Sequence, residues 1–397
     1  MWILSLLMSA SAETALRCTV IVNFASINLK NCFIVTGTNA YVVRVPQLQI
    51  LLKIRIADGS FKMASARMER LNPYVQCGLQ SLAVALHLLI SYGTCGFSVV
   101  CFLLLLFTPL RWITVLYGIW YCYDWNCSSR GGRPLRWLCS LSVWNHFRDY
   151  FPIHIIKTAD LDPGGKYVMG VHPHGASLAL GALCTFHTEA LGFRNLFPDI
   201  DVRLLALKTV FQIPLLREYA LSFGTCDVSR KSIDYLLNRG AGSAVAIVVG
   251  GGKEVFEIDS KDYKLVLRNR KGFIRTAIQH GAHLVPVFIF GENDIYRLAF
   301  PRGSVVYKVQ RFIQKHFGGC LLFVIGKGLF TKGAGLMPFR KPITMVVGAS
   351  IPTEQKSDPS QAEIDLLHRH YLDRLLDLFE THKEHCGYAA SKLFFIE

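Results

Sequence analysis

The run "KYVMGVHPHGASLALGAL", Lys166 to Leu183, carries two histidines between an apolar segment and a segment of small and apolar residues. The first segment is typical of a buried strand and the second of a helix. Pro173 removes one main-chain N–H and fixes φ, while Gly175 allows a sharp turn into the helix. Because α/β folds carry their chemistry at the carboxyl ends of strands, His172 and His174 are predicted site residues. The alternative is one structural histidine and one helix-capping histidine.

From about Pro152 to the C-terminus the chain alternates between strand-like and helix-like segments. Helical periodicity predicts helices at 213–221, 230–239, 270–281 and 360–385. Apolar runs predict strands at 166–171, 202–207, 243–249, 283–290, 320–326 and 343–348. This alternation predicts an α/β layered domain.

A membrane segment is predicted before this domain. Residues 71–110 contain no Asp, Glu, Lys or Arg, and forty residues suffice for two helices of about 20 residues each. We expect a transmembrane hairpin over 71–123 that turns at "SYGTCG", Ser91 to Gly96, with a single span or a re-entrant wedge as the alternative. Basic residues on both sides predict that both ends face the cytosol: Arg67, Arg70, Arg130, Arg133 and Arg136.

Residues 1–70 form an N-terminal extension of unknown role, and 124–397 form the predicted catalytic domain. The segment "MWILSLLMSASAET", residues 1–14, is a weak candidate for a signal peptide because its apolar core is short. Met63 is a sensible start for the rest of the chain, so residues 1–62 are predicted to be dispensable. A chain beginning at Met63 that lost all activity would contradict this.

The composition restricts the class of partner. The 397 residues are 51% hydrophobic and only 18% charged, with 43 Lys+Arg against 28 Asp+Glu. A net charge of +15 suits anionic lipid headgroups or a polyanionic small molecule such as coenzyme A. The chain has neither a Lys/Arg block nor an RNA-stacking motif, so nucleic acid is not an expected partner. The twelve cysteines form no CxxC pair, and the histidine pairs lack zinc-like partners, which predicts reduced thiols and no metal site.

Three further motifs carry candidate site residues. The run "VVGGGKEVFE", residues 248–257, fails the phosphate-loop pattern, and its glycine turn is predicted to bring Glu254 to the site. Glu292 and Asn293 follow the strand at 283–290 as possible site-lining residues. A basic cluster at a helix start is expected to attract phosphate: Arg268, Arg270 and Lys271. The alternatives are that the glycine run forms only a tight structural turn, that Glu292 and Asn293 are ordinary turn residues, and that the basic cluster is a solvated face.

The motifs "VHPHG", "RNRKGF", "HGAHLVPVFIFGEND" and "RKPITMVVGASI" resemble the diacylglycerol O-acyltransferase type 2 family, which includes monoacylglycerol and wax-alcohol acyltransferases. The resemblance runs from about Leu71 to the C-terminus. It implies a mixed sheet flanked by helices, as in glycerolipid acyltransferases, and an enzyme of the endoplasmic reticulum membrane and lipid droplets with a cytosolic catalytic domain. The chain departs from the family with "GGGKE" for a G-G-A-x-E-like run and Gly326-Lys327-Gly328 for G-R-G.

The implied reaction transfers an acyl group from acyl-coenzyme A to the hydroxyl of diacylglycerol without a cofactor. We predict His174 as the general base and His172 as its orienting neighbour, with the roles exchanged as the alternative. Gly175 and the Pro173 turn are expected to supply the oxyanion site, and Glu254 to hold the histidine tautomer or the acceptor. Arg268, Arg270 and Lys271 are assigned to the coenzyme A phosphates. Membrane lipid and a second copy of the chain are the other expected partners.

Rival functions stay open at this point. A monoacylglycerol or fatty-alcohol acyltransferase shares every motif, and a lipid-droplet scaffold without activity would also need the hairpin. A serine hydrolase is suggested by Gly175, Ser177 and Ala179, which give G-x-S-x-A where a nucleophile elbow has G-x-S-x-G. Replacement of Ser177 by Ala separates a hydrolase from a histidine-based transferase.

Overall fold

The computed structural model describes residues 18–19, 32–36, 39–43, 72–176, 179–259, 261–317, 323–329 and 333–397. The chain divides into two compact units, Met1–Val75 and Gln76–Glu397. In the first unit β1 (Cys18–Thr19), β2 (Cys32–Thr36) and β3 (Asn39–Val43) form an antiparallel sheet. The predicted signal-like segment at residues 1–14 lies outside the described residues, as do Met63 and Ser177.

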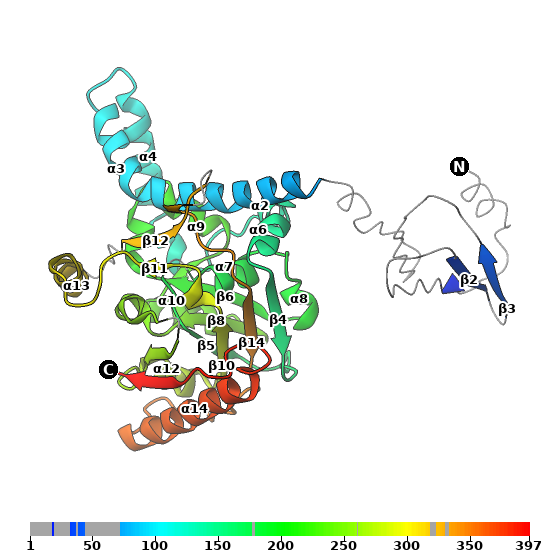
Figure 1. The fold of residues 1–397 in the computed structure, drawn as a ribbon. Coiled ribbons are helices and arrows are strands. Elements are labelled where there is room, and N and C mark those ends of the chain that lie inside the picture. The colour runs from blue at the N-terminus through cyan, green and yellow to red at the C-terminus, as the bar shows by residue number, and fades with distance from the viewer. Residues whose placement is uncertain are drawn as a thin grey trace, which may run out of the picture. The chain divides into compact units, whose positions relative to one another are not determined.

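The second unit is built on a mixed seven-stranded sheet (Figure 1). The strands lie in the order β4 (Ile153–Lys157), β14 (Ile343–Val347), β10 (His283–Phe290), β5 (Tyr167–His172), β8 (Ser243–Val248), β6 (Asp201–Ala206) and β7 (Cys226–Asp227). Every neighbouring pair is parallel except β10 and β14. The predicted mixed sheet flanked by helices is therefore confirmed.

Helices cover both faces of this sheet, and the alternation of side chains along β5 shows how. Met169 and Val171 join one buried cluster with α6 (Val143–Tyr150) and α7 (Leu180–His187). Val168 joins the other cluster with α10 (Arg230–Leu237), α12 (Gly272–His280) and α14 (Gln361–His382). Because successive strand residues point to opposite faces, the period of two places His172 on the α12–α14 face. A capping box, in which Ser360 and Glu363 bond each other's main chain, begins α14.

The N-terminal helices differ from the predicted hairpin in where the chain turns. Helical backbone runs from α2 (Pro73–Leu88) through the π-helical η1 (Leu89–Gly93) into α3 (Thr94–Leu105), so the turn predicted at 91–96 is wrong. Gly93 is helical, at φ −63°, and does not end the helix. The chain reverses after α3 instead, where Pro109 precedes α4 (Arg111–Tyr123).

The two helices α3 and α4 pack against each other and project from the rest of the unit, as Figure 1 shows. The rings of Phe102 and Tyr117 lie 4.7 Å apart, and the Thr114 hydroxyl donates to the Phe102 carbonyl at 3.1 Å. Within the described part of the chain, the helix at Pro73–Gly93 is the one long and apolar enough to cross a membrane. This leaves a transmembrane hairpin unconfirmed.

The remaining elements include the 13-residue helix α13 and two small sheets, β11-β12-β13 and β15-β9. They are η2 (Trp125–Ser129), α5 (Arg136–Cys139), α8 (Phe193–Leu196), η3 (Lys208–Gln212), α9 (Leu216–Ser222), α11 (Gly251–Glu254), η4 (Val255–Glu257), β9 (Tyr263–Val266), η5 (Glu292–Asp294), β11 (Arg297–Leu298), α13 (Val305–Phe317), β12 (Val324–Lys327), β13 (Ala334–Gly335) and β15 (Leu393–Ile396). Of the strand predicted at 320–326, residues 320–322 lie outside the described residues and the rest overlaps β12.

Candidate active site

The site residues gather at one edge of the sheet. Strands β10, β5, β8, β6 and β7 are parallel, so their carboxyl ends share an edge. In Figure 1 β4 runs away from α2, and β14 is parallel to β4 but antiparallel to β10. The shared carboxyl edge therefore lies on the side of α2 and the α3–α4 pair.

His172 is the last residue of β5 and is fully buried, ahead of a cis peptide bond to Pro173. Its Nε2 lies 3.0 Å from the Tyr371 hydroxyl, which is also 3.2 Å from the Gly170 carbonyl. A hydroxyl has one proton, so both bonds form only when Tyr371 donates to Gly170 and Nε2 carries the imidazole proton. Nδ1 then has a buried lone pair without a partner among the described residues. Burial lowers the pKa of His172 to about 3, which keeps the ring neutral.

His174 occupies the turn after β5 and is only partly buried. Its Nδ1 lies 3.3 Å from the Gly175 carbonyl, and since a carbonyl accepts, Nδ1 carries the proton in this bond. This tautomer leaves the basic lone pair on Nε2. Burial lowers the pKa of His174, so the ring is neutral at pH 7 and can take up a proton.

Glu254, at the end of α11, holds the main chain of the histidine turn. One carboxylate oxygen accepts the N–H of His174 at 2.6 Å, and the other accepts the N–H of Val266 at 2.9 Å. Burial raises the pKa of Glu254 to about 7 despite these two donors. A Cβ on Gly250 would overlap the carboxylate, which explains a glycine before α11. The carboxylate thus contacts the main chain of His174 and not its ring.

Glu292, just after β10, caps the helix that follows the histidine turn. Its two oxygens accept the N–H groups of Leu180 (2.7 Å) and Gly181 (2.9 Å), in the first turn of α7. The side chain is fully buried, and burial raises its pKa to about 7. A Cβ built on Gly175 would lie only 2.6 Å from Glu292 Cγ. Neighbouring Asn293 is also buried, with an Oδ1 that has no partner among the described residues.

The three residues of the predicted basic cluster differ in their contacts. Lys271 pairs with Asp365 of α14 at 2.8 Å, so its charge is already compensated. Arg270 is exposed and near enough to Glu254 to lower the pKa of that carboxyl. Arg268 is exposed at the start of the loop before α12. Arg268 and Arg270 are therefore the two of these three that can meet an incoming anion.

Tyr371 is the site residue that sequence reasoning missed. It lies 199 positions from His172, on the buried face of α14 that also carries His368. Burial raises its pKa above that of an exposed tyrosine, so the phenol stays neutral. A phenol at a core position of a helix was the available signal, because a buried hydroxyl needs a partner.

A mixed sheet with two neutral histidines and two buried glutamates at its carboxyl edge is the framework of an α/β enzyme. The family model for diacylglycerol acyltransferase matches residues 103–396. The chain belongs to this family and is an O-acyltransferase.

Named relatives act on different acceptors. Acyl-CoA wax alcohol acyltransferase 1 of Mus musculus is 46% identical over 74% of this chain and 89% of that protein. The human 2-acylglycerol O-acyltransferase 3 is 44% identical over 74% and 87%, and the human diacylglycerol O-acyltransferase 2 is 42% identical over 79% and 81%.

Among solved structures, the 1-acyl-sn-glycerophosphate acyltransferase PlsC of Thermotoga maritima is 12% identical, with a TM-score of 0.35 over 78% of this chain and 97% of that chain. At this TM-score the predicted glycerolipid-acyltransferase fold stays a prediction.

Proposed function

We propose that the chain transfers an acyl group from acyl-coenzyme A to diacylglycerol and forms triacylglycerol. The observation that carries the proposal is the neutral imidazole of His174, a partly exposed residue at the sheet edge of a member of this acyltransferase family. Monoacylglycerol and long-chain alcohols are the alternative acceptors, because relatives named for a wax alcohol, a 2-acylglycerol and diacylglycerol are almost equally identical to this chain (46%, 44% and 42%).

In the proposed reaction His174 Nε2 takes the proton of the acceptor hydroxyl while the hydroxyl oxygen attacks the thioester carbonyl. The new C–O bond forms a tetrahedral oxyanion, and main-chain N–H groups of the turn at Gly175 are assigned to stabilise it. The C–S bond then breaks, and coenzyme A leaves as the thiol with the proton held by His174. This direct transfer needs neither a cofactor nor an acyl-enzyme.

A membrane position for the enzyme is supported by the α3–α4 pair. Its helices have 12 and 13 residues, or about 18–20 Å, which is shorter than a hydrocarbon core of about 30 Å. Large apolar side chains are exposed along both helices, among them Phe97, Leu104, Leu116 and Ile119, and Phe107 is exposed in the turn between them. We propose that this pair enters one leaflet as a re-entrant wedge and keeps the catalytic unit on the cytosolic surface of the endoplasmic reticulum or a lipid droplet.

This placement matches where the two substrates are found. A buried methylene of an acyl chain is worth about 0.8 kcal/mol, so diacylglycerol stays in the membrane. The carboxyl edge with His174 lies on the side of the unit from which α3 and α4 project, whereas the polar end of acyl-coenzyme A stays in water. Protease protection in sealed microsomes tests the arrangement: digestion of the catalytic unit from outside supports it, and full protection contradicts it.

Acyl transfer is tested with radiolabelled acyl-coenzyme A and microsomes given monoacylglycerol, diacylglycerol or a long-chain alcohol. The preferred labelled product identifies the acceptor. His174→Ala is expected to lose all transfer, and His154→Ala, an exposed histidine on edge strand β4, is the matched control. Equal turnover of the two purified variants would end the assignment of His174.

A further inference from the structure

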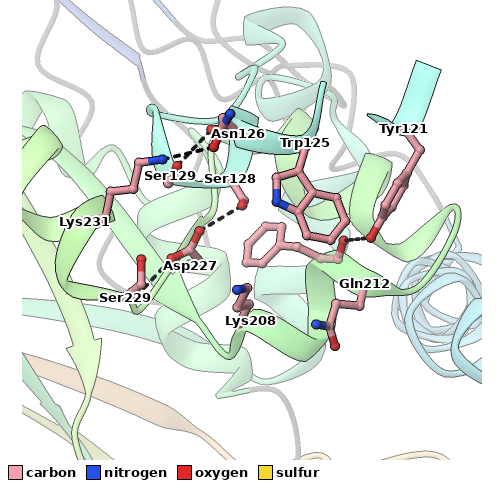
Figure 2. Close-up of a pocket in the computed structure, with 11 residues that line it drawn as sticks. Tyr121, Trp125, Asn126, Ser128, Ser129, Lys208, Gln212, Asp227, Ser229 and Lys231 are labelled. Carbon is pink, nitrogen blue, oxygen red and sulfur yellow. Dashed lines mark hydrogen bonds between the residues drawn. The ribbon is translucent and has the colours of Figure 1, made fainter. Parts of the chain in front are cut away.

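A second polar site lies at the same edge of the sheet, under the end of α4. Figure 2 shows a pocket lined by the last turn of α4, η2, η3, β7 and the start of α10. Its volume is about 130 Å³. Its central residues are Trp125, Lys208, Asp227, Ser229 and Lys231. The volume exceeds that of several water molecules and admits a phosphate group.

The pocket lies on the catalytic edge but away from the histidines. Lys208 follows the carboxyl end of β6, and Ser229 follows that of β7. In the sheet order β5-β8-β6-β7, three strand spacings separate β5 from β7, or about 14 Å. A long ligand can therefore lie across the edge, with one end at His174 and the other in the pocket.

The charges of the pocket favour an anion. Both oxygens of Asp227 are engaged, one by the Ser128 hydroxyl at 2.8 Å and one by the Ser229 N–H at 3.0 Å. Lys231 donates to the neutral amide oxygen of Asn126 at 3.0 Å. Neither Lys208 nor Lys231 forms an ion pair with a carboxylate of the described residues. Two cations thus face a pocket whose one carboxylate is turned toward its own donors.

The aromatic wall adds a flat apolar face. The Trp125 ring is half exposed and lies at the pocket above Lys208 and Gln212 in Figure 2. An indole face can stack on a nucleobase, and tryptophan also suits the headgroup layer of a membrane. An indole beside two lysine ammonium groups fits a ligand whose phosphate binds the lysines and whose adjoining part packs against the ring.

We propose that this pocket binds a phosphate group, through Lys208 and Lys231, with Trp125 covering the adjoining part of the ligand. Two sources share this chemistry: the phosphorylated nucleotide end of coenzyme A and the headgroup of an anionic phospholipid at the base of the wedge. The coenzyme A source rests on the proposed function.

The test compares Lys208→Ala/Lys231→Ala in the full chain with wild type. Adenosine 3′,5′-bisphosphate is titrated calorimetrically, and the KM for acyl-coenzyme A is measured. A second arm measures flotation with phosphatidylcholine vesicles, with and without phosphatidic acid. Lys261→Ala, an exposed lysine before β9, is the matched control, and the double Lys→Arg variant is expected to retain binding.

A loss of bisphosphate affinity of about tenfold, with a matching rise in KM and unchanged flotation, assigns the site to coenzyme A. Loss of the phosphatidic acid dependence alone assigns it to lipid, and loss of both supports the phosphate site for either source. Unchanged affinity and flotation overturn the proposal, as does a wild type that binds neither probe. A wild type that binds the bisphosphate but transfers no acyl group would refute the proposed reaction and leave the pocket standing.

Discussion

Gly175→Ala is the sharpest test of how the histidine turn is built. Gly175 has φ +70°, a conformation that costs a residue with a Cβ about 1–2 kcal/mol. The new methyl group would lie 2.6 Å from Glu292 Cγ and 3.2 Å from the Glu292 Oε1 and carbonyl oxygen. Glu292 is fully buried, and shifting it stretches its bonds to Leu180 and Gly181, so about 1–3 kcal/mol of overpacking adds to the backbone term. The free energy of unfolding should fall by about 2–5 kcal/mol.

Thermal unfolding and acyl transfer are measured on the purified variant. At roughly 2 °C per kcal/mol for a unit of this size, the Tm should fall by about 4–10 °C. Transfer should fall further, because the displaced turn carries His174. Gly303→Ala is the control, since Gly303 has φ +89° and nothing within 4 Å of a Cβ, so it bears the backbone term alone. If the two variants melted together and both kept full activity, the close packing of Gly175 on Glu292 would be refuted.

Three further predictions concern the groups around this turn and the base of the wedge. Burial raises the pKa of Glu292 to about 7 in the folded state, above its unfolded value near 4.5. The stability that the protonated carboxyl gives is therefore complete below about pH 4.5 and is lost as the pH rises through about 7. Between pH 5 and pH 8 the Tm of wild type should fall by more than the Tm of Glu292→Gln. Tyr371→Phe leaves the buried Nε2–H of His172 unpaired and should lower the free energy of unfolding by about 1–3 kcal/mol in urea titrations, together with kcat; an unchanged midpoint would exclude the Nε2–H tautomer. Arg217 is almost fully buried and bonds Asp124 at the end of α4. Arg217→Met should lower the free energy of unfolding by about 3–5 kcal/mol and expose the chain near Asp124 to limited proteolysis; an unchanged cleavage pattern would show that the ion pair does not anchor the wedge.

The elements of the central sheet were largely predictable because their signals are local. The strand predicted at 283–290 coincides with β10, and the helix predicted at 360–385 contains α14. A continuous apolar run flanked by breakers and a long amphipathic period each decide the structure of one segment without reference to another. The antiparallel pairing of β14 with β10 depends on contacts between distant segments, and no local pattern carries it.

The turn of the N-terminal helices was misplaced for a related reason. "SYGTCG" has the composition of a turn, yet Gly93 and Thr94 are helical. Glycine permits a turn but does not require one, and in an apolar environment unbroken helical hydrogen bonding is favourable. Pro109 was the stronger signal, since proline lacks the N–H that helix continuation needs.

The sequence predicts that the candidate site residues lie near one another, but not which atoms they contact. Both histidines and both glutamates come together at the sheet edge, but neither carboxylate touches a ring. Glu254 binds the N–H of His174, and Glu292 binds the first amides of α7. Sequence spacing predicts which strand end a side chain follows, whereas the atom that it contacts depends on the backbone path of the turn.

These contacts bear on which histidine is the base. Both rings are neutral, but the lone pair of His172 is on Nδ1 of a fully buried ring, with Nε2 engaged by Tyr371. A lipid hydroxyl could reach that atom only by opening the core between β5 and α14. His174 is partly exposed, has its main chain fixed by Glu254, and has its basic lone pair on Nε2. A general base must come within hydrogen-bond distance of the proton it removes, so access alone favours His174 over His172 as the base of the proposed reaction, before any difference in pKa is considered.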